Sequence, residues 1–251
     1  MPLWPSAPLE RPLPPPARIA FLTAQPFAHR GLHGSGIVEN SRAAFRAAIA
    51  RGHGIEFDVQ AAIAGEAMVF HDAELDRLTD AHGRLDAQTA EAIGAIRLRG
   101  SDETIPRLDE VLRLVGGRVP VLIEVKSQRH RITGLCLAVR RALEGYRGRV
   151  AVMSFDPRVP AWFGEHSERT VRGLVVTAPP PQTIRHRVER MLAMRAAHPD
   201  FVAHDVRQLP TALTQRLRAK GVPVLTWTVR GDADRRVAAL HADQAIYEEM
   251  A

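Results

Sequence analysis

The sequence predicts an α/β fold in which most strands run parallel, and three observations predict it. Short apolar runs alternate with longer helical patterns along the chain. Several runs, such as 121–125 and 222–229, are almost continuously apolar, which is typical of strands buried on both faces of a parallel sheet. The length of 251 residues is one that α/β barrels use for a single core, although it also allows two small domains.

The order of the expected elements follows from these runs and from glycines that end helices. Gly52, Gly145 and Gly221 stand at or just beyond helix ends, where a left-handed residue is common. Eight runs are expected to be strands, at 26–29, 55–59, 68–71, 119–125, 150–155, 171–176, 201–204 and 222–229, and 242–247 is a ninth candidate. Helices are expected at 41–51, 108–115, 133–143, 183–197, 213–220 and 233–240, with a shorter helical piece at 88–96.

Three stretches depart from this order. Residues 1–18 are proline-rich, and because proline fixes φ and lacks a backbone donor, we expect an extended arm ahead of a single domain at 19–251. From 73 to 104 no strand is evident, so this stretch is expected to be an insertion over one rim of the domain. The link 62–67 is too short for a helical crossover, which leaves the direction of the next strand and the strand count open.

The composition favours a soluble protein without a nucleic-acid partner. The formal net charge of +6 would suit an anionic partner, but lysine occurs only at Lys126 and Lys220 and the arginines are scattered through helical stretches. Solvated helix faces are therefore the preferred explanation. No run approaches the roughly 20 apolar residues of a membrane helix. Because Cys136 is the only cysteine and no apolar signal segment is seen, we expect a cytoplasmic location without stable membrane insertion.

Ionisable residues gather where the first expected strand ends. His29 and Arg30 follow that strand, and Glu39 and Asn40 stand just before the next helix. In parallel α/β folds, ligands bind where the strands end. Asn40 or Ser41 could instead cap the helix, so capping and ligand contact remain open for both.

Two carboxylates, Glu56 and Asp58, occupy the second expected strand two residues apart. On a strand this spacing places both side chains on one face. Two inward carboxylates repel each other unless a cation neutralises them, and their oxygens suit Mg²⁺ or Ca²⁺. A solvent-exposed edge strand of alternating polarity would give the same pattern.

Two further strands end in ionisable residues. His71 and Asp72 follow an apolar run, and Glu124 and Lys126 share one face of a strand that should be dry. A strand-end histidine is often structural, and Glu124 with Lys126 could be a plain ion pair. Coincidence is a poor explanation for four strands that all end this way, so the sequence indicates one site.

These residues resemble the glycerophosphodiester phosphodiesterase family, in particular its bacterial cytoplasmic type. The resemblance runs from about Pro26 to nearly the C-terminus. Its motifs are Ala28-His29-Arg30-Gly31, Glu39-Asn40-Ser41 with Ala44-Phe45, Ile55-Glu56-Phe57-Asp58-Val59, Val69-Phe70-His71-Asp72 with Leu75-Asp76-Arg77-Leu78-Thr79, Ile105-Pro106-Arg107-Leu108 and Glu124-Val125-Lys126, extended by Ser154-Phe155 and Trp227-Thr228-Val229.

The resemblance implies a (β/α)₈ TIM barrel, with the small insertion after its third strand, that hydrolyses glycerophosphodiesters to sn-glycerol 3-phosphate and an alcohol. It implies one divalent cation, Mg²⁺ or Ca²⁺, and makes the insertion a segment that covers the substrate. His29 and His71 would be the general acid and base, in an order left open. By position, the metal ligands would be Glu56, Asp58 and Glu124, the phosphate-binding residues Arg30 and Lys126, and the pocket wall Trp227, with Glu39 and Asn40 as weaker candidates.

Departures and alternatives remain. The family commonly carries a Thr-Asp step near the C-terminus, where this chain reads Ile246-Tyr247-Glu248, so any contact from the last strand is left open. A related barrel phosphodiesterase acting on lysophospholipids or phosphoinositides would share the same histidines and carboxylates. A nucleic-acid binder using its arginines would not explain the inward carboxylates. The oligomeric state is not predicted.

Overall fold

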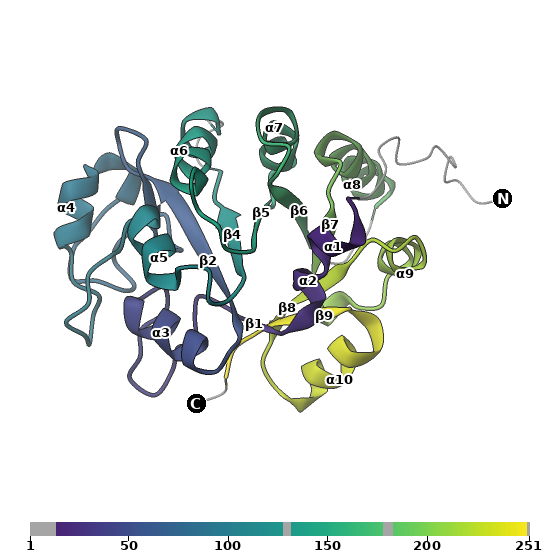
Figure 1. Cartoon of the computed structure of the whole chain (residues 1–251), viewed down its shortest axis with the longest axis horizontal. Helices are drawn as coiled ribbons and strands as arrows, with labels where there is room; N and C mark the ends of the chain where they lie inside the picture. The colour runs from purple at the N-terminus through teal and green to yellow at the C-terminus, as the bar shows by residue number, and fades with distance from the viewer. Residues whose placement is uncertain (1–13, 128–131, 178–182, 250–251) are drawn as a thin grey trace.

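The computed structural model describes residues 14–127, 132–177 and 183–249. Within these residues, eight parallel strands close into a barrel with helices around it (Figure 1). The strands follow the order β1-β2-β4-β5-β6-β7-β8-β9, and β9 pairs with β1 to close the ring. The expected (β/α)₈ barrel is confirmed. The strand bounds are β1 Phe27–Ala28, β2 Gly54–Ala61, β4 Val121–Val125, β5 Val150–Ser154, β6 Val171–Val176, β7 Phe201–Asp205, β8 Val224–Val229 and β9 Gln244–Tyr247.

The strand β3 (Ala67–Val69) lies outside the barrel and runs antiparallel to the end of β2. Val69 pairs with Val59 and Ala67 with Ala61, so the residues between them form a tight hairpin connection. A parallel pairing would need a crossover of a dozen or more residues. The direction that the sequence left open is therefore antiparallel, and the ninth candidate run supplies the eighth barrel strand.

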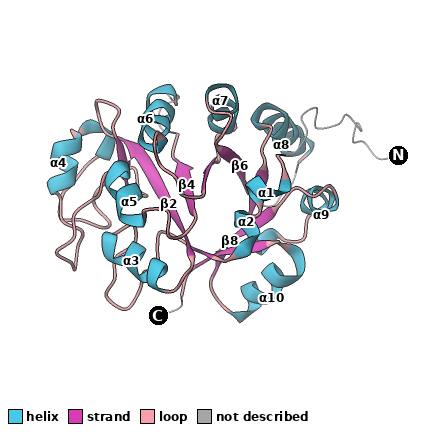
Figure 2. Cartoon of the chain, viewed as in Figure 1, coloured by secondary structure: helices cyan, strands magenta, loops and turns pink. Residues whose placement is uncertain are grey.

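The two faces of β3 pack against different apolar clusters. Ala67 and Val69 belong to the large cluster between the barrel and its helices, whereas Met68 belongs to a separate cluster with residues of the insertion. The stretch 73–104, which the structure describes in full, contains the 3₁₀ helix η1 (Leu85–Ala87), the helix α4 (Ala90–Ala95) and isolated bridges but no strand. The insertion therefore has a small apolar core of its own, beside the barrel (Figure 2).

The helices around the barrel begin and end close to the expected residues. They are α3 Arg42–Ala50, α5 Leu108–Val115, α6 Thr133–Leu143, α8 Ile184–Ala197, α9 Ala212–Ala219 and α10 Asp232–His241, each within one residue of its expected bounds. The helix α7 (Arg158–His166) was not expected. It contains Pro160, which lies in the first turn, where the missing N–H breaks no intrahelical hydrogen bond.

Two short helices, α1 (Pro16–Ile19) and α2 (Phe21–Ala24), precede the barrel. The expectation of an extended arm as far as residue 18 is therefore wrong at its end, because Pro16 begins a helix, a position that its fixed φ suits. Residues 1–13 of the expected arm lie outside the described residues.

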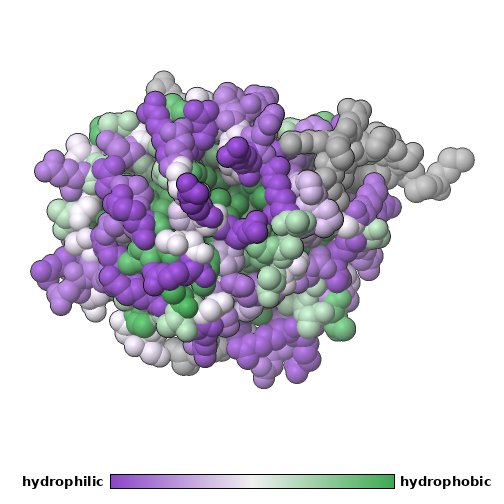
Figure 3. Space-filling model, in the orientation of Figure 1, coloured by the Kyte–Doolittle hydropathy of each residue, from purple (hydrophilic) through white to green (hydrophobic). Residues whose placement is uncertain are grey.

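The helices α1 and α2 close one end of the barrel. Ile19 and Leu22 share an apolar cluster with inward-facing barrel residues such as Phe27 and Phe201. In Figure 1 both helices lie over the β7, β8 and β9 side of the barrel, and hydrophobic residues gather toward the middle of the same view in Figure 3. Because α1 and α2 lead into the start of β1, they occupy the end where the strands begin and leave the opposite end for a site. No helix in the described part of the chain has the length and apolar character needed to cross a membrane.

Candidate active site

The carboxyl ends of the barrel strands bring together most of the residues predicted from the sequence. The parallel register pairs Asp58 of β2 with Glu124 of β4, and Glu56 lies two residues earlier on the same face. A cavity of about 320 Å³ opens above them. Of the predicted residues, seven line this cavity and three do not: the lining residues are His29, Arg30, Glu56, His71, Glu124, Lys126 and Trp227, and the others are Asp58, Glu39 and Asn40.

The three acidic residues form one buried group. One carboxylate oxygen from each of Glu56, Asp58 and Glu124 lies within 4.8 Å of the other two. All three side chains are buried, so the exposed edge strand that would also have explained the spacing of Glu56 and Asp58 is excluded. Among the residues that the structure describes, Glu56 Oε1 has no hydrogen-bond partner, while its Oε2 accepts a hydrogen bond from the Arg30 backbone N–H at 3.1 Å.

The electrostatic environment separates the pKa values of these carboxyls. Burial, together with the charges of Asp58 and Glu124, raises the pKa of Glu56 well above its usual range. Burial also raises the pKa of Glu124, against the opposing effect of Lys126. For Asp58 burial alone would raise the pKa, but Lys126 and Arg30 lower it overall.

Two cationic side chains face these carboxylates. Lys126 Nζ lies 2.9 Å from Asp58 Oδ1 and also forms an ion pair with Glu124. Arg30 Nε lies 3.4 Å from Asp58 Oδ2, and its Nη1 donates to Glu39 Oε1 at 2.7 Å. Burial disfavours the charge on Lys126, yet the neighbouring carboxylates raise its pKa overall. Both cations therefore stay charged at the mouth of the carboxylate group.

His29 uses its two ring nitrogens in different directions. Its Nδ1 lies 2.6 Å from Glu248 Oε1, and its Nε2 lies 3.9 Å from Glu56 Oε2. Because an ionised carboxylate only accepts hydrogen bonds, Nδ1 carries the donated proton and Nε2 faces the site. Burial lowers the pKa of His29, and Glu248 partly opposes that effect.

His71 has the same arrangement on the other side of the site. Its Nδ1 lies 2.6 Å from Asp72 Oδ1, and Arg77 holds Asp72 by donating from Nη2 to the same oxygen at 3.1 Å. Arg77 also donates to Glu39 Oε1 at 2.8 Å, which connects the insertion to the loop after β1. Burial lowers the pKa of His71. Each predicted catalytic histidine therefore has a carboxylate partner on Nδ1.

The loop that carries Arg30 and Asn40 depends on left-handed backbone positions. Arg30 has φ +55°, Gly31 φ +79° and Asn40 φ +55°. A Cβ on Gly31 would approach within 2.7 Å of the Ala44 Cβ, so only glycine fits there. Asn40 Nδ2 donates to Asp58 Oδ2 at 3.1 Å, while Ser41 caps α3 by accepting from the Ala44 N–H. Ser41 is therefore the capping residue of α3, whereas Asn40 contacts a carboxylate of the site.

Apolar side chains also line the cavity, and we call them its apolar wall. Trp227 lies edge-on to Phe155 with ring centroids 5.4 Å apart, and its indole Nε1 donates to the Ala203 carbonyl at 3.2 Å. Met153 and Ile246 also line the cavity. The site can therefore contact both an anionic group and carbon atoms.

The residue that the sequence analysis left unassigned is Glu248. The His29 backbone N–H donates to the Tyr247 carbonyl at 2.8 Å, and this closing contact between β1 and β9 brings Glu248 against the His29 ring. Arg230 Nε holds the other carboxylate oxygen at 2.7 Å. Burial opposes ionisation of Glu248, but His29 and Arg230 lower its pKa to about 2. The only available signal was an acidic residue directly after the last strand.

The carboxylate group fits a hard divalent cation. It offers one oxygen donor from each of three buried side chains, and Glu56 also carries a buried acceptor, Oε1, without a hydrogen-bond partner among the described residues. An unpaired buried carboxylate oxygen is costly, and Mg²⁺ or Ca²⁺ would satisfy it.

Comparison with known proteins relates the chain to one family. A family model described as the glycerophosphoryl diester phosphodiesterase family matches residues 29–251. A glycerophosphodiester phosphodiesterase from Bacillus altitudinis is 37% identical over 140 residues, which are 51% of this chain and 57% of that protein. The matched region thus spans little more than half of that relative's length.

Solved structures show the same fold. A phosphodiesterase from Oleispira antarctica, solved with the product sn-glycerol 3-phosphate, superposes with a TM-score of 0.76 at 21% identity over 90% of this chain and 93% of that one. A glycerophosphodiester phosphodiesterase from Thermotoga maritima gives a TM-score of 0.69 at 23% identity over 88% and 92% of the two chains. On the strength of the family match, which covers all but the first 28 residues, this chain belongs to the glycerophosphoryl diester phosphodiesterase family.

Proposed function

We propose that the chain hydrolyses glycerophosphodiesters to sn-glycerol 3-phosphate and an alcohol, with one bound Mg²⁺ or Ca²⁺. The observation that carries the proposal is the group of three buried carboxylates, Glu56, Asp58 and Glu124, beside two histidines that each have a carboxylate on Nδ1. Family membership and the product bound in the Oleispira antarctica protein support the same reaction.

The carboxylate group would hold the cation. When bound, such a cation offsets the charge of a phosphodiester and polarises its oxygens. Arg30 and Lys126 already lie against Asp58, and their charge faces the cavity. They therefore would bind phosphoryl oxygens that the carboxylates repel, as guanidinium and ammonium groups do in phosphate sites.

The histidines would move the protons. With Nδ1 held by Glu248, His29 presents Nε2 to the site, and Asp72 fixes His71 in the same way. One imidazole accepts the proton of the nucleophile, which is water or the 2-hydroxyl of the substrate's own glycerol, and the other donates a proton to the leaving alkoxide. The near-symmetry of the two arrangements suits a reaction in which acid and base exchange roles.

The apolar wall would position the carbon part of the substrate. Trp227 and Phe155 line the same cavity as Lys126 and Glu124, and their rings contact each other. Their rings offer contact to a glycerol backbone without competing for the phosphate.

The test is release of sn-glycerol 3-phosphate from a panel of glycerophosphodiesters, with EDTA and with added Mg²⁺ or Ca²⁺. We expect release that EDTA abolishes and a divalent cation restores. Comparing the rates on lysophosphatidylcholine and glycerophosphocholine tests the alternative that the chain acts on lysophospholipids. No release from any substrate under any of these conditions would refute the proposal, and release that EDTA leaves unchanged would refute its metal requirement.

A further inference from the structure

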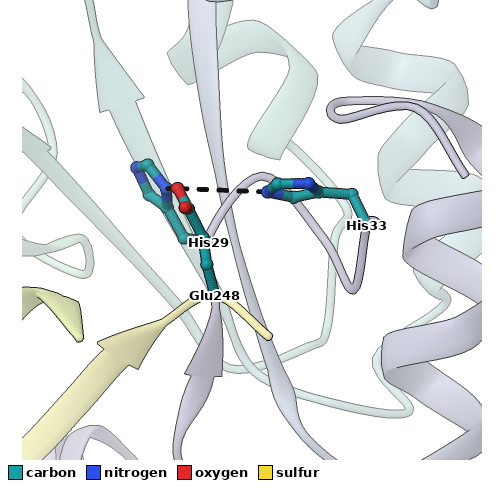
Figure 4. A group of neighbouring side chains, drawn as sticks. All are labelled: His29, His33 and Glu248. Carbon is teal, nitrogen blue, oxygen red and sulfur yellow. Dashed lines mark hydrogen bonds and ion pairs between the residues drawn. The ribbon is translucent and has the colours of Figure 1, made fainter. Parts of the chain in front are cut away.

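A second group of potential metal ligands lies beside the carboxylate group. Figure 4 shows His29 and His33 on either side of Glu248. Glu248 Oε1 is 2.6 Å from His29 Nδ1 and 4.0 Å from His33 Nε2. One ligand atom from each residue lies within 4.8 Å of the other two. We call these three residues the His-His-Glu cluster.

Nothing in the proposed reaction explains His33. It does not line the cavity, yet its Nε2 is buried and has no hydrogen-bond partner within the described part of the chain. The backbone fixes its position, because the His33 N–H donates to the Gly31 carbonyl and the Leu32 N–H to the Ala44 carbonyl, both at 3.0 Å. A buried ring nitrogen that is held in place and left unpaired is costly unless something binds it.

The donor set of the cluster differs from that of the carboxylate group. Glu56, Asp58 and Glu124 offer only hard oxygens, whereas the cluster offers two imidazole nitrogens and one carboxylate. Imidazole nitrogens favour Zn²⁺ and similar transition metals over Mg²⁺ and Ca²⁺. Two histidines with one glutamate, plus an open position for water, is a ligand set that Zn²⁺ uses in enzymes.

The distances suit such an ion after small side-chain shifts. Ligand atoms about 2.0–2.1 Å from a tetrahedral Zn²⁺ lie roughly 3.3–3.5 Å from one another. The contacts of Glu248 with His29 and His33, 2.6 and 4.0 Å, lie on either side of that range. The first must lengthen and the second must shorten, each by less than about 1 Å.

We propose that the His-His-Glu cluster binds Zn²⁺ or a similar transition-metal cation, separately from the cation of the carboxylate group. The ion takes the place of the proton between His29 Nδ1 and Glu248. Binding through Nδ1 displaces the proton from that nitrogen to solvent, and the ring takes up a proton from solvent on Nε2, the nitrogen that faces Glu56, so that the bound imidazole is neutral. His29 then cannot accept a proton, so occupation of the cluster inhibits hydrolysis; this consequence, unlike the binding itself, rests on the proposed function.

Arg230 opposes the ion. Its Nε lies 2.7 Å from Glu248 Oε2 and its Nη2 lies 3.2 Å from Oε1. The guanidinium therefore competes for the carboxylate and repels a second cation. Removing its charge should strengthen binding.

The test is calorimetric titration of ZnCl₂ into the full chain in excess Mg²⁺, which keeps the carboxylate group occupied. We expect one Zn²⁺ per chain. His33→Gln should weaken binding at least tenfold, and the same change at the exposed His82, which contacts Asp76, should leave it unchanged. Arg230→Gln should strengthen binding. In the hydrolysis assay, His33→Gln should keep the activity measured without zinc and require at least tenfold more Zn²⁺ for half inhibition.

Zinc binding that Mg²⁺ abolishes, or that His33→Gln leaves unchanged, would overturn the proposal. Should His33→Gln fail to fold, Arg230→Gln remains decisive, because unchanged or weaker zinc binding in that variant also overturns it. The two proposals fail separately. If zinc binding depends on His33 but the chain shows no hydrolase activity, the cluster is supported and the proposed function is refuted. If the chain is a hydrolase but shows no such zinc binding, the function is supported and the cluster is refuted.

Discussion

Replacing Glu56 by glutamine should stabilise the metal-free protein and at the same time remove its response to metal. The Glu56 side chain is buried beside Asp58 and Glu124, and its Oε1 has no hydrogen-bond partner in residues 14–127, 132–177 and 183–249. Glutamine has the same shape and can still accept the Arg30 N–H. Its amide would place a donor, instead of a third negative charge, near the other two carboxylates.

The sign and size of the stability change follow from the raised pKa of Glu56. A carboxyl whose pKa is higher in the folded than in the unfolded state destabilises the fold once pH exceeds its unfolded pKa. The cost grows as pH rises toward the folded pKa, by about 1.4 kcal/mol for each unit between the two values. Without metal, Glu56→Gln should therefore raise the free energy of unfolding at pH 8 and have little effect below about pH 4.

Bound metal should instead stabilise the wild type and have little effect on the variant. A cation at a hundred times its Kd stabilises the wild type by about 2.7 kcal/mol, or a Tm rise of roughly 5–11 °C for a chain of this size. Glu56→Gln loses one of three anionic ligands and should show little of this rise.

Thermal unfolding at pH 5 and pH 8, with EDTA or with Mg²⁺, measures both effects. Glu91→Gln, at an exposed position of α4, is the matched control and should behave as the wild type. The reasoning is refuted if Glu56→Gln keeps the full metal-induced rise, or if it is less stable than the wild type in EDTA at pH 8.

Three further substitutions test the rest of the site. His71→Ala should lower kcat by about 10²–10⁴ while the Tm rise with Mg²⁺ remains, because it removes a proton donor or acceptor and no metal ligand; unchanged turnover would exclude His71 from the mechanism. Glu248→Gln should lower kcat roughly 10–100-fold with little change in KM, as loss of a histidine's carboxylate partner does, and a change confined to KM would contradict this role. Trp227→Ala should raise KM by roughly tenfold because the apolar wall is lost, and steady-state kinetics with an unaltered KM would show that Trp227 does not contact the substrate.

The barrel could largely be predicted because its signals are local. Continuous apolar runs located strands such as β6 at its observed bounds, and helical periodicity did the same for α5 and α6. Within the site, the spacing of Glu56 and Asp58 was enough to place both on one face, where the structure buries them together. The hydrophobic pattern of a short segment is enough to predict whether it forms a strand or a helix, without any knowledge of the fold.

What the sequence could not reveal depends on how the barrel closes. His29 and Glu248 are 219 residues apart, and only the pairing of β1 with β9 brings them together. No local pattern marks that contact. The helix α7 was missed for a different reason, since Pro160 reads as a helix breaker unless its place in the first turn is known.

The two-sided packing of β3 has an evolutionary consequence. Phe70, Leu75 and Ile93 pack in a cluster apart from that of the barrel, and β3 contributes residues to both. Apart from Arg77, which holds Asp72 and Glu39, residues within 73–104 can therefore change without disturbing the carboxylates or His29. Descendants of such a chain can inherit the barrel's chemistry unchanged while they vary the insertion. New substrate preferences in this lineage would accordingly arise at the rim before they arise in the barrel.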